Sequence, residues 1–161
     1  MNVTFQKMCL EHLDEVLKIE ELSFPSPWSR SSFIYEITQN QFACYIVAVA
    51  EEKVAGYGGM WLILDEAHIT NVAVHTDYRM NGIGGALMVE LIRRAILRGA
   101  SRMTLEVRPS NTAARRLYAS LGFKDIGLRK RYYTDTNEDA IIMWKDNLAT
   151  GSQLCPAGRN C

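Results

Sequence analysis

The sequence predicts a single α/β domain, of the α+β kind, in which helices pack on the faces of one mixed β-sheet. Three observations predict this fold class. At 161 residues the chain is long enough for one well-packed domain and short for two. Apolar residues make up 48% of it and charged residues 22%, as in soluble globular proteins. Segments of strand and helix periodicity follow the order β-α-α-β-β-β-α-β-α-β-β, without a repeat or an interdomain linker.

The N-terminal part of the chain predicts one strand and two helices. Apolar and polar residues alternate over residues 3–8, which is typical of a strand. Over residues 10–22 the apolar residues recur at helical spacing and form one stripe. The proline-containing segment 24–28 ends this helix, and Ser29 can cap a second helix over residues 29–37.

The remaining elements follow from the same patterns. Residues 82–98 carry a helical apolar stripe, and Gly99 is well placed to end that helix in a left-handed conformation. A capped helix is expected over residues 111–121, ending at Gly122. Apolar runs bounded by turn residues predict strands over residues 42–50, 54–64, 68–74, 103–107, 123–132 and 140–144.

The predicted domain covers residues 1–148. Residues 149–161 carry no periodicity, so we expect a disordered C-terminal tail outside the fold.

Composition excludes several classes of function. Eighteen basic residues balance eighteen acidic ones, so no net charge draws the chain to nucleic acid or anionic lipid. The sequence contains no signal-peptide pattern and no apolar run of the roughly 20 residues that span a membrane. The four cysteines and three histidines show no zinc-ligand spacing. We therefore expect a cytoplasmic protein with reduced thiols and no metal.

The strongest functional signal is the segment Tyr78-Arg79-Met80-Asn81-Gly82-Ile83-Gly84-Gly85-Ala86-Leu87. It reads Arg-x-x-Gly-x-Gly between an apolar strand and a helix. Glycines let a ligand approach the backbone closely, and a helix start offers unpaired N–H groups and the positive end of its dipole. This combination suits a pyrophosphate, so the sequence predicts a site for a phosphorylated cofactor.

A dinucleotide-binding unit is the main alternative for this motif. Strand, glycine turn, helix and second strand occur in order, and Glu106 lies at about the position of a ribose-binding acid. However, Gly-x-Gly-x-x-Gly requires a glycine where Leu87 stands. The glycines also begin eight residues after Val74, rather than directly after the strand. Both observations disfavour this alternative.

The motif and its surroundings resemble the GNAT family of N-acetyltransferases. The resemblance rests on the strand end Asn71-Val72-Ala73-Val74, the glycine motif, and Asn111 and Tyr118 on the next helix. It covers nearly all of the predicted domain. It implies a single GNAT-like domain with a mostly antiparallel sheet of about seven strands and about four helices. Within the motif, Met80 and Asn81 replace the polar, often basic residues common in the family.

Several patches resemble, more narrowly, the bacterial ribosomal-protein-alanine N-acetyltransferases of this family. They include Pro27-Trp28, Leu64-Asp65-Glu66-Ala67, Leu105-Glu106-Val107-Arg108-Pro109-Ser110-Asn111 and Arg131-Tyr132-Tyr133. This resemblance implies that the chain transfers the acetyl group of acetyl-CoA to the N-terminal α-amine of a protein. The implied acceptor is the N-terminal alanine of small-subunit ribosomal protein eighteen.

The resemblance implies a donor site for acetyl-CoA made largely of main-chain groups. The motif loop would surround the pyrophosphate and Asn111 would bond the pantetheine arm. An extended arm that carries amides can also pair with a strand edge, and a strand N–H could then polarise the thioester carbonyl. The implied donor-site residues are Val72, Ala73, Val74, Arg79, Met80, Asn81, Gly82, Ile83, Gly84 and Asn111.

Glu106 and Tyr118 are the candidate catalytic residues. Strand alternation directs Glu106 away from its apolar neighbours, and a structural ion pair with Arg108 or another cation is the alternative. Tyr118 lies on an apolar helical stripe, so its ring can belong to the core while its hydroxyl has another role. The resemblance implies that Glu106 is the general base and Tyr118 the general acid.

Tyr132 and Tyr133, expected in the loop between the last two strands, are candidates for holding the first residues of the acceptor. An ordinary half-exposed strand end is the alternative. His68 and His75 are interpreted as structural residues, and Trp61 and Trp144 as core residues.

The acceptor also follows from acid–base chemistry. An α-amine has a pKa of about 7.7–8.0, against about 10.4 for lysine, so a single carboxylate base suits an α-amine better. Two alternatives remain open, namely acetylation of a lysine or a small-molecule amine, and an acyl-CoA-binding module without catalysis. We expect a monomer or a weak dimer.

Overall fold

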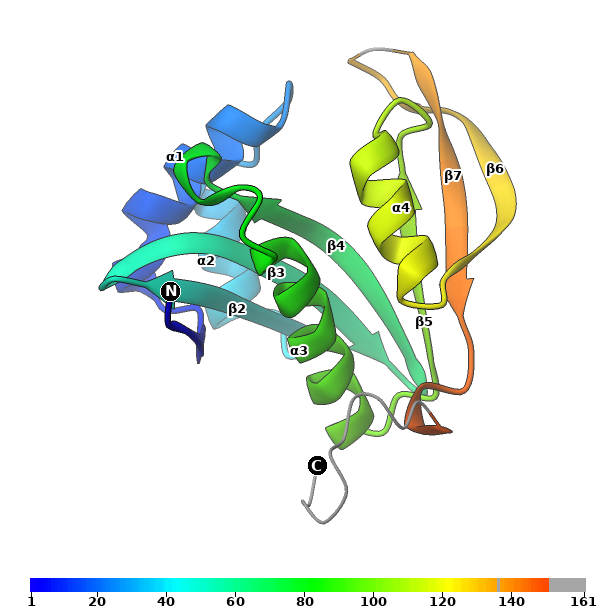
Figure 1. Cartoon of the computed structure of the whole chain (residues 1–161), viewed down its shortest axis with the longest axis horizontal. Coiled ribbons are helices and arrows are strands. Elements are labelled where there is room, and N and C mark those ends of the chain that lie inside the picture. The colour runs from blue at the N-terminus through cyan, green and yellow to red at the C-terminus, as the bar shows by residue number, and fades with distance from the viewer. Residues whose placement is uncertain (136, 151–161) are drawn as a thin grey trace.

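The structure, a computed structural model, describes residues 1–135 and 137–150. Within them, seven strands form one sheet in the order β1-β2-β3-β4-β5-β7-β6, flanked by four α-helices (Figure 1). All neighbouring strands are antiparallel except β4 and β5, which run parallel. The predicted fold class and element order are therefore confirmed.

The N-terminal elements follow the predicted ranges closely. Ser29 caps α2 as expected, because its hydroxyl oxygen accepts a hydrogen bond from the Ser32 N–H at 3.2 Å. The first helix begins later than predicted, after a 3-10 turn at Leu10–His12. The elements are β1 (Val3–Lys7), α1 (Leu13–Ser23), α2 (Arg30–Thr38), β2 (Ala43–Ala50), β3 (Lys53–Ile63) and β4 (Glu66–Val74).

The C-terminal elements begin with a 3-10 turn at Thr76–Tyr78. Gly99 and Gly122 follow the next two helices with φ of 90° and 96°, as the sequence predicts. The elements are α3 (Ile83–Leu97), β5 (Arg102–Val107), α4 (Thr112–Ser120), β6 (Lys124–Tyr133), β7 (Glu138–Lys145) and a 3-10 turn (Leu148–Thr150).

Two expectations about the C-terminal part change. Tyr132 and Tyr133 belong to the end of β6 rather than to the following loop. The reason is that Tyr133 pairs with Glu138 of β7 after an irregularity at Arg131, whose φ is 52°. Leu148 is buried against the core beneath α3, and residues 149–150 continue its 3-10 turn. The rest of the predicted tail lies outside the described residues.

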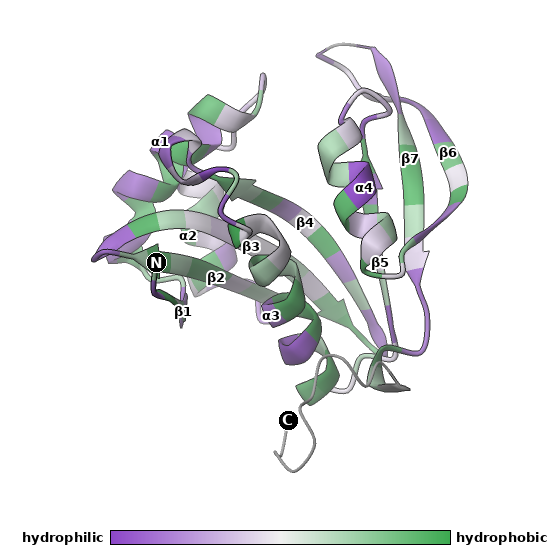
Figure 2. Cartoon of the chain, in the orientation of Figure 1, coloured by the Kyte–Doolittle hydropathy of each residue, from purple (hydrophilic) through white to green (hydrophobic). Residues whose placement is uncertain are grey.

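Two apolar cores lie on opposite faces of the sheet because successive side chains of a strand point to opposite sides. Along β2, Ile46 and Ala48 belong to the core beneath α3, whereas Tyr45 and Val47 belong to the core beneath α1 and α2. The central strands are thus covered on both faces. Figure 2 shows that β7 is largely apolar, whereas the neighbouring edge strand β6 carries many more polar residues.

The parallel pair β4–β5 is short. Its register joins only Glu66, Ala67 and His68 to Arg102, Met103 and Thr104, and beyond these residues the two strands diverge (Figure 1). The sheet therefore opens between Ile69 and the end of β4.

None of the helices in the described residues has the length and apolar character needed to cross a membrane. The same residues contain no group of three histidine, cysteine, aspartate or glutamate side chains that could hold a metal ion. Cys9 and Cys44 are free thiols. Cys155 and Cys161 lie outside the described residues.

Candidate active site

The opening between β4 and β5 exposes main-chain groups of β4. The His75 N–H donates to the Ala55 carbonyl on the β3 side at 2.8 Å, and successive N–H groups of a strand alternate in direction. The N–H groups of Val72 and Val74 therefore face the opening. Ala73, between them, directs its N–H to β3 and its methyl group into the core beneath α1 and α2. Val72 and Val74, two of the three strand residues predicted to bind the donor, thus direct an N–H group into the opening.

The glycine motif lies beside the same end of β4. The Arg79 Nε donates to the Val74 carbonyl at 3.2 Å and so ties the loop to the strand. Among the described residues, the N–H groups of Ile83, Gly84 and Gly85 in the first turn of α3 have no acceptor. These free donors and the positive end of the helix dipole suit a phosphate group.

Positions 82 and 84 of the motif are occupied by glycine for different structural reasons. Gly82 has a φ of 75°, which L-residues with side chains rarely adopt, although a Cβ there would meet nothing within 4 Å. Gly84 lies inside α3, where glycine is unfavourable by about 1 kcal/mol relative to alanine. A Cβ at Gly84 would meet nothing closer than 3.8 Å, so the protein itself does not require glycine there. The missing side chain leaves room for a bound group.

A β-bulge aligns polar residues on the other face of β4. The register of β3 and β4 shifts between Gly59 and Met60, so Thr70 is an extra residue between Ile69 and Asn71. Ile69 belongs to the core beneath α3, whereas Thr70 and Asn71 both face α1 and α2. Without the extra residue, consecutive side chains would point to opposite faces.

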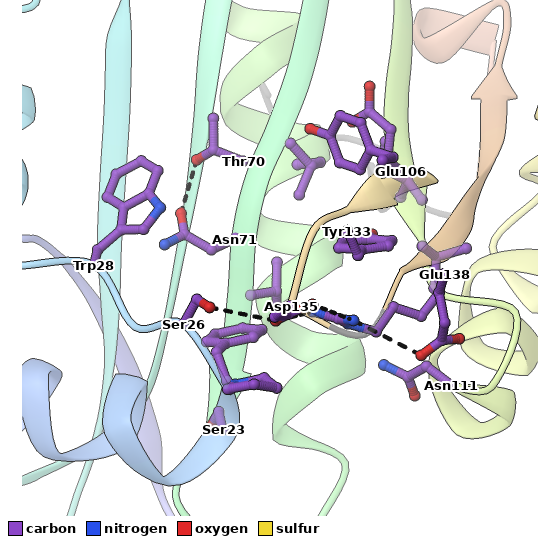
Figure 3. A pocket seen from close by; sticks show the side chains of 18 of the residues that line it. Ser23, Ser26, Trp28, Thr70, Asn71, Glu106, Asn111, Tyr133, Asp135 and Glu138 are labelled. Carbon is purple, nitrogen blue, oxygen red and sulfur yellow. Dashed lines mark hydrogen bonds and ion pairs between the residues drawn. The ribbon is translucent and has the colours of Figure 1, made fainter. Parts of the chain in front are cut away.

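A cavity of about 660 Å³ joins this face to the opening. It brings together Val72, Glu106, Asn111, Tyr118, Tyr132 and Tyr133 of the predicted site. Its walls also include the α1–α2 loop and the turn between β6 and β7 (Figure 3). Ala73, Val74 and the predicted loop residues Arg79, Met80, Asn81, Gly82, Ile83 and Gly84 do not line it, because they lie farther along β4 and α3.

Glu106 is held at the cavity wall by His68. Alternation along β5 buries Met103, Leu105 and Val107 and turns Glu106 to the opposite face, as predicted. Its side chain is 8% exposed, and Oε2 lies 2.6 Å from His68 Nε2. His68, interpreted from the sequence as a structural residue, thus has its partner in the Glu106 carboxylate.

Of the cations predicted as alternative partners of Glu106, Arg108 bonds elsewhere, whereas another, Arg129, lies 3.9 Å from the Glu106 carboxylate. Arg108 pairs with Asp135 at 2.8 Å, lies 3.7 Å from Glu138, and stacks its guanidinium 4.0 Å from the Tyr133 ring centre. These contacts fix the β6–β7 turn against β5. Burial raises the pKa of Tyr133 to about 12, so its hydroxyl is protonated at neutral pH.

Tyr118 reaches the cavity from α4. Its ring packs against Phe123 with 6.0 Å between ring centres, and burial raises the pKa of its hydroxyl to about 12. No hydrogen bond to this hydroxyl occurs within the described residues. Asn111 caps the same helix, because its Oδ1 accepts from the Ala114 N–H at 3.2 Å. This bond leaves the Asn111 Nδ2 available to a ligand.

The remaining aromatic residues near the site differ from expectation. Trp61 and Trp144 are half-buried rather than core residues. Trp61 donates its indole N–H to Glu36 at 3.1 Å and meets the His68 ring edge-on, whereas Trp144 stacks beneath the Arg102 guanidinium.

A further cavity, of about 490 Å³, shares Trp61, His68 and Glu106 with the first.

The wall opposite Glu106 contains a buried carboxyl group. Glu20 of α1 is 2% exposed, and its Oε1 accepts from the Trp28 N–H at 3.2 Å. Burial raises the pKa of Glu20 to about 7, although the Trp28 N–H and the nearby Asn71 amide lower it. The α1–α2 loop is thus anchored by a carboxyl group that is costly to ionise.

Comparison with known proteins gives consistent matches. The model of the acetyltransferase (GNAT) family matches residues 13–123. A provisionally named ribosomal protein bS18-alanine N-acetyltransferase of Bacillus subtilis (strain 168) is 42% identical over 139 residues, covering 86% of this chain and 92% of that protein. The ribosomal protein bS18-alanine N-acetyltransferase of Escherichia coli (strain K12) is 41% identical over 129 residues, covering 78% and 84%. The crystal structure of the ribosomal-protein-S18-alanine N-acetyltransferase from Escherichia coli superposes with a TM-score of 0.83 at 36% identity, covering 91% of this chain and 94% of that chain.

Replacing Glu20 with glutamine should stabilise the fold in a pH-dependent way. The pKa of this carboxyl rises from 4.5 to about 7 on folding, so ionisation penalises the folded state above pH 7 and not below about pH 4.5. We expect Glu20→Gln to raise the free energy of unfolding by up to about 3 kcal/mol at pH 8 and by little at pH 4. Urea unfolding at both pH values measures this, with Glu21→Gln on the exposed side of α1 as the control. Equal effects of Glu20→Gln at both pH values would contradict the assignment.

Proposed function

Because the chain belongs to the acetyltransferase (GNAT) family, we propose that it transfers the acetyl group of acetyl-CoA to the N-terminal α-amine of a protein. The observation that carries this proposal is one cavity in which Glu106, Tyr118 and the open edge of β4 meet. The names of the relatives from Bacillus subtilis and Escherichia coli support the N-terminal alanine of ribosomal protein bS18 as the acceptor.

Acetyl-CoA is the acetyl donor of this family, and the free groups of the chain fit it. The first turn of α3 offers N–H donors to the pyrophosphate, with room above Gly84. The N–H groups of Val72 and Val74 face the opening, where an extended pantetheine arm can pair as a strand does. The Asn111 Nδ2 has no partner within the described residues and can bond an amide of the same arm.

Glu106 acts as the general base in this proposal. Its carboxylate removes a proton from the α-amine of the acceptor, either directly or through water, and His68 holds it in position at 2.6 Å. Tyr118 acts as the general acid and protonates the departing sulfur, since its raised pKa keeps the hydroxyl protonated until then. The Val72 or Val74 N–H stabilises negative charge on the carbonyl oxygen.

Tyr132 and Tyr133 hold the acceptor in this proposal. Their rings pack edge to face at 5.0 Å, and Tyr132 is 42% exposed. Tyr133 is fixed by Arg108, so the pair presents a rigid surface at little entropic cost.

The first test is mass spectrometry of peptides mixed with the protein and acetyl-CoA. We expect a gain of one acetyl group at free N-termini, strongest for an alanine-first basic peptide, and little gain on an N-blocked lysine peptide. Glu106→Gln should lower kcat by about 100-fold or more while the Kd of acetyl-CoA stays the same. Acetylation confined to the lysine peptide would contradict the proposed acceptor, and full activity of Glu106→Gln would remove the base assignment.

Replacing Tyr118 with phenylalanine tests the acid. The change removes only a hydroxyl that has no partner in the described residues, so we expect unchanged thermal stability. We expect kcat to fall by about 100-fold. Because a pKa of about 12 keeps the wild-type hydroxyl protonated from pH 6 to pH 10, the loss should be similar across this range, which steady-state kinetics measures. An unaltered rate would contradict the acid role and leave Tyr118 with a packing role alone.

Replacement with alanine should change the stability of the protein in opposite directions at Gly84 and at Gly99. Gly84→Ala should stabilise the protein by up to about 1 kcal/mol because it improves helix propensity without a clash. It should also weaken acetyl-CoA binding, by about tenfold, because the methyl group occupies the space next to the first-turn N–H groups. Calorimetry and thermal unfolding measure the two effects.

Gly99→Ala is the matched control for that variant. Its φ of 90° is strained for alanine, and it lies at the far end of α3. We therefore expect lower stability with unchanged acetyl-CoA binding. Equal acetyl-CoA affinity of the wild type and Gly84→Ala would place the pyrophosphate elsewhere.

A further inference from the structure

The second cavity, of about 490 Å³, lies over a part of the sheet that no helix of the described residues covers (Figure 1). Its lining includes one row of paired residues, Trp61, His68, Thr104 and Trp144, which crosses four strands. This row lies on the face that carries α1 and α2, because Trp61 bonds to Glu36 of α2. The core beneath these two helices, however, contains residues of β2, β3 and β4 and, within the described chain, none of β5, β6 or β7. The cavity is therefore a hollow in the free part of this face.

Apolar side chains form the floor of this cavity. Trp61, Trp144 and Ile142 are half-buried, and Ile63 at the end of β3 is 51% exposed. Neighbouring apolar side chains that stay open to solvent on a free sheet face provide a surface that a bound group can cover. The floor therefore suits the apolar part of a ligand.

The two ends of the cavity differ in charge. At one end, Arg129 lies 3.9 Å from the Glu106 carboxylate and offsets its charge. At the other end, Asp65 and Glu66 are neighbours at the turn between β3 and β4. Glu66 and His68 alternate along β4, so this acidic end lies about 6.6 Å along the strand from the contact of His68 with Glu106. The cavity thus combines an apolar floor with an acidic end that suits a cation.

The chain already holds one of its own cations at the acidic end. The Arg102 guanidinium lies 3.9 Å from the Trp144 ring centre, 3.4 Å from Glu66 and 3.0 Å from Asp146. The Asp65 carboxylate accepts a hydrogen bond from a neighbouring hydroxyl group at 3.0 Å but has no ion pair within the described residues. An arginine side chain thus fits here against an indole ring and between carboxylates, and one carboxylate remains available to a second cation.

The second cavity adjoins the main cavity at the proposed base. Trp61, His68 and Glu106 line both cavities. In the proposed reaction the α-amine of the acceptor lies at Glu106, and the Cα of the second residue is about 3.8 Å from the Cα of the first. A side chain that begins there and has a stem of three methylenes can cross the apolar floor to Asp65 and Glu66.

We propose that the second cavity binds the side chain of the second residue of the acceptor and prefers a long cationic side chain, such as that of arginine. The inference rests on the proposed function. The methylenes of such a side chain cover the floor at Trp61 and Ile142, and its guanidinium reaches Asp65 and Glu66. A shorter side chain leaves the floor open, and an acidic side chain meets carboxylates of like charge.

The test measures kcat/KM of the full-length protein for three alanine-first peptides that differ only at the second residue, which is arginine, citrulline or alanine. Citrulline replaces the guanidinium with a neutral group of nearly the same shape, so the arginine-to-citrulline ratio isolates the charge. The citrulline-to-alanine ratio isolates the stem. We expect the first ratio to be about fivefold and the second about tenfold.

A double variant separates the carboxylates from the floor. In Asp65→Asn/Glu66→Gln we expect the arginine-to-citrulline ratio to fall below about twofold, while the citrulline-to-alanine ratio stays as in the wild type. Glu51→Gln/Glu52→Gln is the matched control, because it removes two adjacent carboxylates at the opposite end of the 11-residue strand β3. Both ratios should keep their wild-type values in this control, and unchanged acetyl-CoA affinity verifies that both variants are folded.

The outcomes distinguish the two proposals. An arginine-to-citrulline ratio near one in the wild type, or a ratio that is the same in the wild type and Asp65→Asn/Glu66→Gln, would overturn the side-chain site while leaving the proposed function intact. An equal fall of the ratio in the control variant would also overturn it. A wild-type protein that acetylates none of the three peptides would overturn the proposed function, and the side-chain site with it.

Discussion

The short pairing of β4 and β5 is the constraint on which the rest of the site depends. Parallel strands normally stay paired over their length, because an unpaired edge leaves backbone groups without partners. Here the register ends after three residues on each strand, while the other edge of β5 stays paired with β7 as far as Val107. The resulting opening exposes the β4 edge and connects the two faces of the sheet. At the start of this opening, where the strands still lie close, Glu106 meets His68.

The site combines rigid and unsatisfied groups. Arg108 fixes the β6–β7 turn through two carboxylates, and Trp28 is held to Glu20 through its backbone. Among the described residues, the groups left over are unpaired N–H donors, a tyrosine hydroxyl without a partner and a carboxyl group with a raised pKa. Such groups lower the stability of the free protein, and substrates that pair with them regain that free energy on binding.

Much of the fold could be predicted from the sequence because its elements are local. The stripe of α3, the cap at Ser29 and the turn glycine Gly99 each depend on a few neighbouring residues. The contact between His68 and Glu106 depends on the register of two strands whose residues are 38 positions apart, and no local pattern reports it. The bulge at Thr70 likewise changes which face Asn71 occupies without any signature in the alternation.

The second cavity gives Glu106 a further neighbouring space. Glu106 and His68 line both this cavity and the main cavity, which acetyl-CoA and the acceptor would occupy in the proposed reaction. Its rim carries Arg129, whose guanidinium lies 3.9 Å from Glu106. A small molecule bound there would contact the same carboxylate that lines the main cavity, and it would change the charge around the proposed base.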